Sequence, residues 1–355
     1  MKRTASGGGG KRALLGRSVS RVSVMGIVAL CASVLLLVIR WDVWRELSAL
    51  ERTLTAGLVL LLIAAVVAGA GGQRKAASWR VRFDANPFAV GALAVLIAMV
   101  WMAVMAPLLV GVGPTELTSP SLTRYARPDL VHPMGTDRFG RDVWARVVYG
   151  GRASFGVCGL SVVLAALLGV VVGGVAGSAP RRVDDMLMRV VDGMLSFPRL
   201  LLLLAAVAFL PPGPVVLATI IAATSWMGVA RIVRAEVRRM RGREFVEAAV
   251  AAGVGRARIV IHHILPNVMG HVVVAATLGA GTVILMESSL SFLGLGVQPP
   301  TPSWGSIVFE GRDALATAWW VSAFPALAIT LAVISLNVIG DGIRDALDAR
   351  IPSKR

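Results

Sequence analysis

Long apolar runs recur along this chain, and they limit what it can fold into more than any other feature. A helix of roughly 20 apolar residues crosses the ~30 Å hydrocarbon core of a bilayer while pairing its own backbone polar groups. The chain has 355 residues, of which 56% are hydrophobic and 16% charged. We therefore predict an all-α, polytopic membrane protein with eight spans, at approximately 22–39, 55–72, 88–110, 154–177, 187–209, 214–230, 272–292 and 321–340.

The net charge of +16 comes from Arg and Lys in the connectors between these runs. Such clusters are typical of cytoplasmic loops, and we expect no nucleic-acid partner. The basic tail 1–21 and the connectors 73–87 and 231–271 are therefore predicted inside the cell, which with eight spans puts both termini in the cytoplasm. The connector 111–152 disagrees, because it should lie outside yet holds six Arg against four acids.

Small residues recur in the fourth predicted span, which holds Gly156, Gly159, Gly169, Gly173, Gly174 and Gly177. Small residues at a spacing such as that of Gly169 and Gly173 let membrane helices approach closely. We interpret the glycines as packing positions without a further function.

The cytoplasmic stretch Arg243–Gly253 carries the most informative local pattern. Phe245, Ala248, Ala249 and Ala252 fall on one helical face, and Gly253 with Gly255 predicts a stop and a turn. A second helix is expected to begin near Ile259 and to be bent or ended by Pro266. We predict an exposed helix–turn–helix whose alanine face fits a groove on a partner protein.

This stretch resembles the EAA loop of permeases from ABC importers, through Glu247-Ala248-Ala249, Gly253 and Leu265-Pro266. Four further segments resemble the dipeptide/oligopeptide/nickel group of that family, in the same order along residues 80–350. They are His132–Asp142, Ser196–Pro198, Glu287–Gly305 and Gly340–Asp348. The resemblance is closest to the C-type permease of the pair.

The resemblance implies a type I permease core of six helices, here residues 80–350, with a coupling loop at about 231–271. The two additional spans in 22–79 precede that core and have no counterpart in the family pattern. Contact with an ATPase is implied for Glu247, Ala248, Ala249 and Gly253. The implied partners are a homologous second permease, two ATP-binding subunits and an extracytoplasmic binding protein, in a bacterial inner membrane. ATP and Mg²⁺ would bind to the partner subunits, and no cofactor to this chain.

Two carboxylates fall in or beside predicted spans. A charge at mid-membrane costs about 2.5–3.5 kcal/mol or more unless it faces protein or water. Glu287 and Asp192 are therefore candidates for the pore or for contacts between helices. His132 has no companion ligand nearby, so no metal site is expected there. Thr136 or Asp137 is instead expected to cap a helix through Arg138–Gly151.

These features predict a non-catalytic permease subunit of an ATP-driven importer for dipeptides, oligopeptides or a related small solute. A nickel or other solute importer of the same family is an alternative. An ion-coupled secondary transporter and a membrane scaffold are further alternatives from other classes. Co-purification distinguishes these classes. An ATPase pair that binds this chain and requires residues 240–266 would favour an ATP-driven importer over a secondary transporter or a scaffold.

Overall fold

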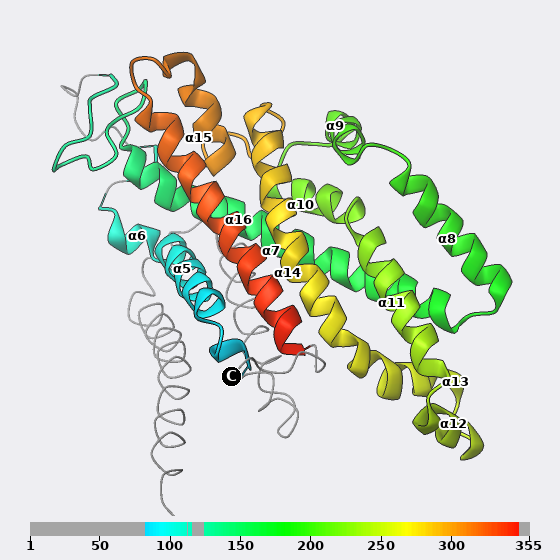
Figure 1. The fold of residues 1–355 in the computed structure, drawn as a ribbon. Helices are drawn as coiled ribbons and strands as arrows, with labels where there is room; N and C mark the ends of the chain where they lie inside the picture. The colour runs from blue at the N-terminus through cyan, green and yellow to red at the C-terminus, as the bar shows by residue number, and fades with distance from the viewer. Residues whose placement is uncertain (1–81, 112, 116–123, 348–355) are drawn as a thin grey trace, which may run out of the picture.

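The computed structural model describes residues 82–111, 113–115 and 124–347. The regular elements in these ranges are helices, accompanied by an isolated β-bridge between Thr136 and Asp142. The predicted tail 1–21 and the predicted spans 22–39 and 55–72 lie outside the described residues. The helices, shown in Figure 1, are α5 (Pro87–Val104), α6 (Ala106–Leu109), α7 (Val143–Ser178), α8 (Arg181–Leu195), α9 (Arg199–Phe209), α10 (Pro214–Ala223), α11 (Trp226–Arg241), α12 (Glu244–Ala251), α13 (Arg256–Ile259), α14 (Leu265–Phe292), α15 (Trp304–Gly311) and α16 (Trp320–Leu347).

Four helical segments are long and apolar enough to cross a membrane on their own. They are α5, α7, the continuous helix Arg256–Phe292 that ends with α14, and α16. The pairs α8–α9 and α10–α11 each pass the same test as a bent unit, which brings the total to six within the described residues. These six correspond to the third to eighth predicted spans and form the expected six-helix core.

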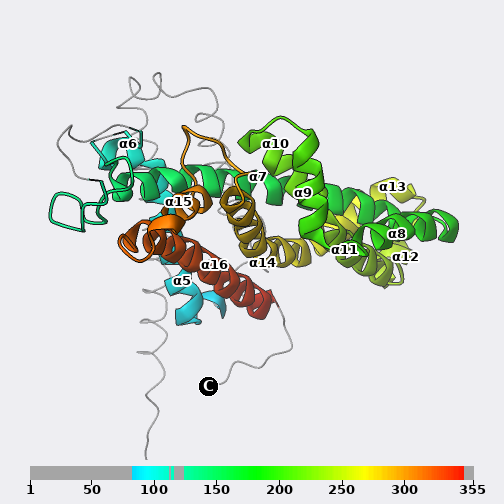
Figure 2. The same ribbon diagram turned by 90° about the horizontal axis from the view of Figure 1, so that it is seen from above.

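Helix α7 is the central element of the bundle. Seen from above, it runs from α5, α6 and α15 on one side to α8, α11 and α13 on the other (Figure 2). Its first half is almost completely buried, and the main hydrophobic cluster includes Val143, Phe155 and Val157 of α7 together with Ile284 of α14. A helix of 36 residues is about 54 Å long, so α7 extends well beyond a ~30 Å hydrocarbon core.

Glycine allows α7 and α11 to pack at very short range. A β-carbon added to Gly173 would lie 2.8 Å from Cβ of Val233, and one added to Gly177 would lie 2.8 Å from Cβ of Val237. Gly169 meets Val229 in the same way at 2.5 Å. The close approach predicted from the four-residue spacing is confirmed.

The fifth predicted span, 187–209, is not one straight helix. Helices α8 and α9 meet at an angle of 87°, and the break falls at Ser196-Phe197-Pro198. Proline has no backbone N–H and disfavours helical geometry at the residue before it, which explains the interruption. The sequence prediction treated this motif only as a family signature.

The sixth span is also bent and is longer than predicted. Helices α10 and α11 meet at 43°, where the Thr224 hydroxyl donates to the carbonyls of Ile220 and Ile221. Hydroxyl groups that bond back to the preceding turn favour such bends. Because α11 continues to Arg241, the segment predicted as the loop 231–271 is mostly helical.

Substituting Gly173 with Ala should loosen the α7–α11 contact. The added methyl group meets packed atoms of α11, and overpacking of this kind costs about 1–3 kcal/mol. We expect a lower thermal unfolding midpoint for Gly173→Ala in detergent. Gly174→Ala is the matched control, because the nearest atom to its added carbon is Cδ2 of Leu265 at 3.8 Å. Equal midpoints for the two variants would contradict the packing role.

Candidate coupling surface and buried polar sites

Helix α12 ends in a Schellman motif built around Gly253. The N–H of Gly253 donates to the carbonyl of Val250 at 2.9 Å, and the N–H of Val254 donates to the carbonyl of Ala249 at 3.0 Å. Gly253 has a φ of +76°, a conformation that L side chains rarely adopt. The stop predicted at Gly253 is therefore confirmed, and it turns the chain into α13.

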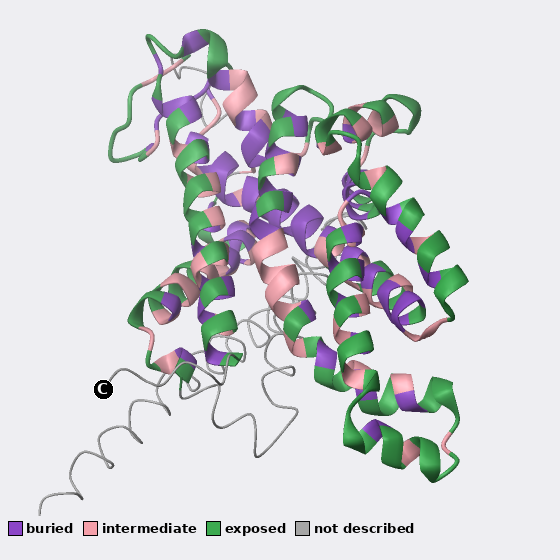
Figure 3. Cartoon of the chain, turned by 45° about the vertical axis from the view of Figure 1, so that its right-hand side comes forward, coloured by how far each residue is buried: buried purple, intermediate pink, exposed green. Residues whose placement is uncertain are grey.

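The outer face of α12 is open to solvent. Phe245, Ala248 and Ala252 are exposed, whereas Val246 is buried in a cluster with Val237 of α11 and Ile264. Ala249 is only half-exposed and packs against that cluster, so it faces the bundle more than predicted. The α12–α13 hairpin projects from the end of the bundle opposite α15 (Figures 1 and 3). We call Phe245, Glu247, Ala248 and Ala252 the coupling surface.

Glu247 lies on this surface without an ion pair to any described residue. It is exposed, and the neighbouring Arg239 pairs instead with Glu236, with Nη2 of Arg239 2.7 Å from Oε2 of Glu236. Helix geometry would also allow Glu247 to pair with Arg243, four residues earlier, but no such pair forms among the described residues. The Glu247 carboxylate is therefore available to a partner.

Pro266 does not end the helix that follows the turn. A π-helical segment, Val260–Ile264, comes immediately before it, and Leu265 N–H donates to the carbonyl of Val260. The helix then continues through α14 to Phe292. Pro266 lies in the first turn of α14, directly after the wider π-turn. The missing backbone N–H of Pro266 is tolerated at this position. The predicted stop at this residue was wrong.

Glu287 is fully buried between α7 and α14. Its carboxylate accepts hydrogen bonds from Ser291 at 2.8 Å, Ser154 at 3.0 Å and Ser288 at 3.4 Å. The Ser154 hydroxyl also accepts from the N–H of Trp304, so the network reaches the start of α15. These hydroxyl donors offset part of the cost of removing a carboxylate from water. The Glu287 carboxylate therefore joins α14 to α7. Of the two roles predicted for it, the pore and contacts between helices, this geometry fits the second.

Asp192 takes the opposite position, on an exposed surface. It pairs with Arg231, and the two side chains are 60% and 51% exposed. Eight residues earlier in α8, buried Asp184 binds both Arg234 and Arg238 of α11, with Nε of Arg234 2.5 Å from Oδ1 of Asp184. The spacing of Arg231, Arg234 and Arg238, three and four residues apart, places them on one face of α11. The sequence prediction used the arginines of this connector only to place it inside the cell.

A second ion cluster at the α15 end of the bundle was not anticipated. Arg146 of α7 binds Glu310 of α15 through two hydrogen bonds of 2.8 Å and binds Asp137 at 2.7 Å. Arg141 contacts the same two carboxylates, at 2.5 Å from Glu310 and 2.6 Å from Asp137. The cluster ties the segment before α7 to α15, across more than 160 residues. No local sequence pattern links these partners.

His132 and the segment after it are structural. His132 is buried, and its Nδ1 lies 3.9 Å from Oδ1 of Asp142. Asp142, rather than Thr136 or Asp137, caps the helix by accepting a hydrogen bond from Trp144 N–H. The helix predicted from Arg138 therefore begins five residues later, because the Asp137 carboxylate binds the backbone of Phe139 and Arg141 in a turn.

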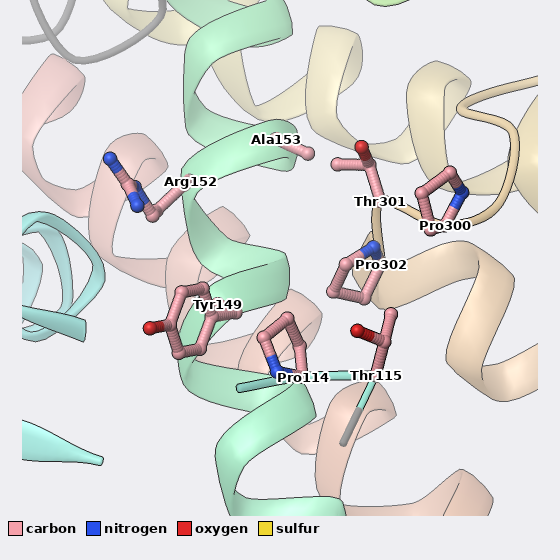
Figure 4. A pocket seen from close by; sticks show the side chains of 8 residues that line it. All are labelled: Pro114, Thr115, Tyr149, Arg152, Ala153, Pro300, Thr301 and Pro302. Carbon is pink, nitrogen blue, oxygen red and sulfur yellow. The ribbon is translucent and has the colours of Figure 1, made fainter. Parts of the chain in front are cut away.

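A cavity of about 230 Å³ lies beside the first half of α7 (Figure 4). Its lining includes Tyr149 and Arg152 of α7 and the segment Pro300–Pro302. Pockets that hold drug-sized molecules are typically 300–1,000 Å³. The volume of this cavity falls below that range.

A helical bundle with up to six candidate membrane spans and an exposed helical hairpin at one end is the architecture of a membrane transport permease. Comparison with known proteins identifies the family. Residues 169–352 match the family described as the binding-protein-dependent transport system inner membrane component, and the chain belongs to it.

Relatives in other bacteria align with most of the chain. A protein of Brucella suis biovar 1, whose given name is that of a peptide transport system permease, is 45% identical over 267 residues, which is 74% of this chain and 88% of that protein. The dipeptide transport system permease protein DppC of Alkalihalophilus pseudofirmus is 41% identical over 278 residues, 78% of this chain and 91% of that protein. The oligopeptide transport system permease protein OppC of Bacillus subtilis is 35% identical over 271 residues, which is 76% of this chain and 88% of that protein.

Loss of Glu310 should destabilise the protein in a way that depends on pH. Burial by itself raises the pKa of Glu310, but hydrogen bonds and charges from Arg146 and Arg141 outweigh it and hold this pKa below the ordinary 4.5. A carboxyl whose pKa is lower in the folded state stabilises that state above its unfolded pKa, and this contribution disappears as the pH falls through the folded pKa. We expect Glu310→Gln to unfold at a lower temperature than wild type at pH 7, with the difference shrinking below pH 4.5.

Asp313→Asn provides the control for this measurement. Asp313 is 76% exposed and pairs only with its neighbour Arg312 among the described residues, so its removal should change the midpoint little at either pH. A Glu310→Gln variant that unfolds like Asp313→Asn at pH 7 would contradict the role given to the cluster.

Proposed function

We propose that this chain is the non-catalytic membrane subunit of an ATP-driven importer whose solute is a dipeptide or short oligopeptide. The observation that carries the solute class is the naming of relatives 35–45% identical to this chain, which are peptide, dipeptide or oligopeptide permeases. The alignments extend over about nine tenths of those relatives, so they include the membrane helices as well as the coupling region.

The coupling surface of α12 would receive a separate ATPase. Glu247, Ala248, Ala249 and Gly253 are the residues proposed for this contact. Alanines let a partner surface approach closely, and the exposed Glu247 offers a carboxylate for a partner cation. Val246 of α12 packs in one cluster with Val237 of α11, which holds α12 against α11. A push on α12 is therefore expected to move α11 with it.

The full transporter would contain a second homologous permease, two ATP-binding subunits and an extracytoplasmic binding protein. ATP and Mg²⁺ would bind to the partner subunits. Nucleotide binding would draw the coupling surfaces of the two permeases together and reorient the spans between outward-open and inward-open states. We place α12 and both termini in the cytoplasm, because the Arg-rich end of α11 flanks the membrane on that side.

The proposal is tested by reconstituting this chain with the ATPases, second permease and binding protein encoded beside it. We expect uptake of radiolabelled alanyl-alanine or a short oligoalanine into proteoliposomes that requires both ATP and the binding protein. Uptake that runs on an ion gradient without ATP, or ATP-driven uptake of a nickel chelate in place of peptides, would contradict the proposal.

Gly253→Glu should uncouple transport without preventing membrane insertion. The substitution places a long charged side chain at a position with positive φ beside the coupling surface, so both the turn and the ATPase contact are disturbed. We expect peptide uptake to fall at least tenfold in proteoliposomes, with normal amounts of the protein in the membrane.

Gly253→Asn is the matched variant, because Asn tolerates the left-handed conformation and carries no charge. It should keep most of the uptake, since no other residue lies within 4 Å of a β-carbon at this position. Wild-type uptake by Gly253→Glu would reject the coupling role.

A further inference from the structure

Helix α8 presents three different faces to its surroundings. One face is buried and holds Asp184, Met188 and Val191. A second is exposed and apolar, with Val183, Met186 and Val190. The third is exposed and charged, and its residues alternate in sign along the helix: Arg181, Asp185, Arg189 and Asp192. We call this third face the charged stripe.

The ion pairs show how α8 is placed. Asp184 contacts Arg234 and Arg238, whereas Asp192, eight residues later, contacts Arg231, which lies earlier in α11. Helix α8 therefore runs antiparallel to α11 for about 12 Å instead of lying across the end of the bundle. Figure 1 shows the same course, with α8 rising from the α11 and α13 end toward α9.

An apolar face and a charged face on one such helix cannot share the same surroundings. Charged side chains are not stable against lipid and face water or protein. No described residue covers the charged stripe, where Arg181 is 92% exposed, Asp185 53% and Asp192 60%. The stripe therefore requires a water-filled space or a polar partner, while Val183, Met186 and Val190 are suited to lipid or to an apolar partner.

We propose that the charged stripe, together with Arg231, lines the aqueous exit path on the cytoplasmic side and binds the charged ends of a zwitterionic peptide. The proposal rests on the proposed function and adds a solute site to it. Asp192 suits an ammonium group and Arg231 or Arg189 suits a carboxylate. An ion pair as exposed as Asp192–Arg231 is weak, so a passing solute replaces either partner easily.

The position of Arg231 also links this site to the coupling surface. Arg231 lies in α11, the helix that leads into α12. Asp192 lies in α8. A movement of α12 that carries α11 along is therefore expected to move Arg231 and Asp192 together, because Asp184 ties α8 to Arg234 and Arg238 of α11. The solute site is expected to move with the coupling surface as one unit.

Cysteine labelling in inverted membrane vesicles tests the proposal. The full chain, expressed with its partner subunits, carries Cys31→Ser and Cys158→Ala and then either Arg189→Cys or Val190→Cys. These adjacent positions are both exposed but lie on the charged and apolar faces. The reagent is a trimethylammonium methanethiosulfonate, which reacts with thiols in water. We expect labelling of Arg189→Cys to be at least tenfold faster than labelling of Val190→Cys.

Protection then distinguishes a solute site from a merely hydrated helix. Alanyl-alanine at millimolar concentration should slow labelling of Arg189→Cys about threefold or more, and the uncharged analogue N-acetylalaninamide should not. Adding Asp192→Asn should abolish the protection. Adding Asp185→Asn, whose partner is Arg181 at the start of the helix, should weaken it less.

Two results would overturn the proposal. Equally slow labelling at both positions would mean that a partner protein covers the stripe, and fast labelling without protection by the dipeptide would mean a helix surface in bulk water. ATP-driven uptake, measured separately with the same cysteine background in proteoliposomes, tests the proposed function. Intact uptake without protection rejects the solute site alone, whereas protection without ATP-driven uptake rejects the mechanism of transport.

Discussion

The direct packing of α11 against the glycines of α7 is the contact on which the rest of the arrangement depends. In a bilayer, helices associate largely through van der Waals contact, and small residues allow the closest approach. Gly169, Gly173 and Gly177 remove the side chains that would separate the two axes. Because α11 is held in this way, it acts as a rigid support with α12 after its C-terminal end and the arginines that position α8 along one side.

Charges near the membrane fall into two groups with different consequences. Glu287, Asp184 and the Arg146 cluster are buried, and each is satisfied by groups from another helix. Breaking such a contact leaves an uncompensated polar group, so these residues hold elements together. The charged stripe of α8 and Glu247 are instead exposed, and each needs something outside the chain. The buried group explains the architecture, and the exposed group is where we propose that the protein meets partners and solute.

Much of this organisation was predictable from local features. Hydropathy located the six described spans, and the spacing of alanines followed by Gly253 located α12 and its end. The errors concern positions where a nearby side chain or a proline competes with regular helix. Asp137 binds two backbone N–H groups and delays the start of α7 to Val143, Pro198 breaks the fifth span, and the π-turn lets the chain pass Pro266. Such competition is decided by geometry that a periodic pattern does not contain.

By itself, the sequence determined the class of protein, because apolar runs of about 20 residues can cross a bilayer with a satisfied backbone as helices. It also determined α12 and its end, since a Schellman turn needs only a glycine at the right place. Only the tertiary structure decided which charges are paired and which remain exposed. Ser154 and Glu287 are 133 residues apart, and Asp192 and Arg231 are 39 apart. Contacts over such distances arise when whole helices pack, and no short stretch of sequence specifies them.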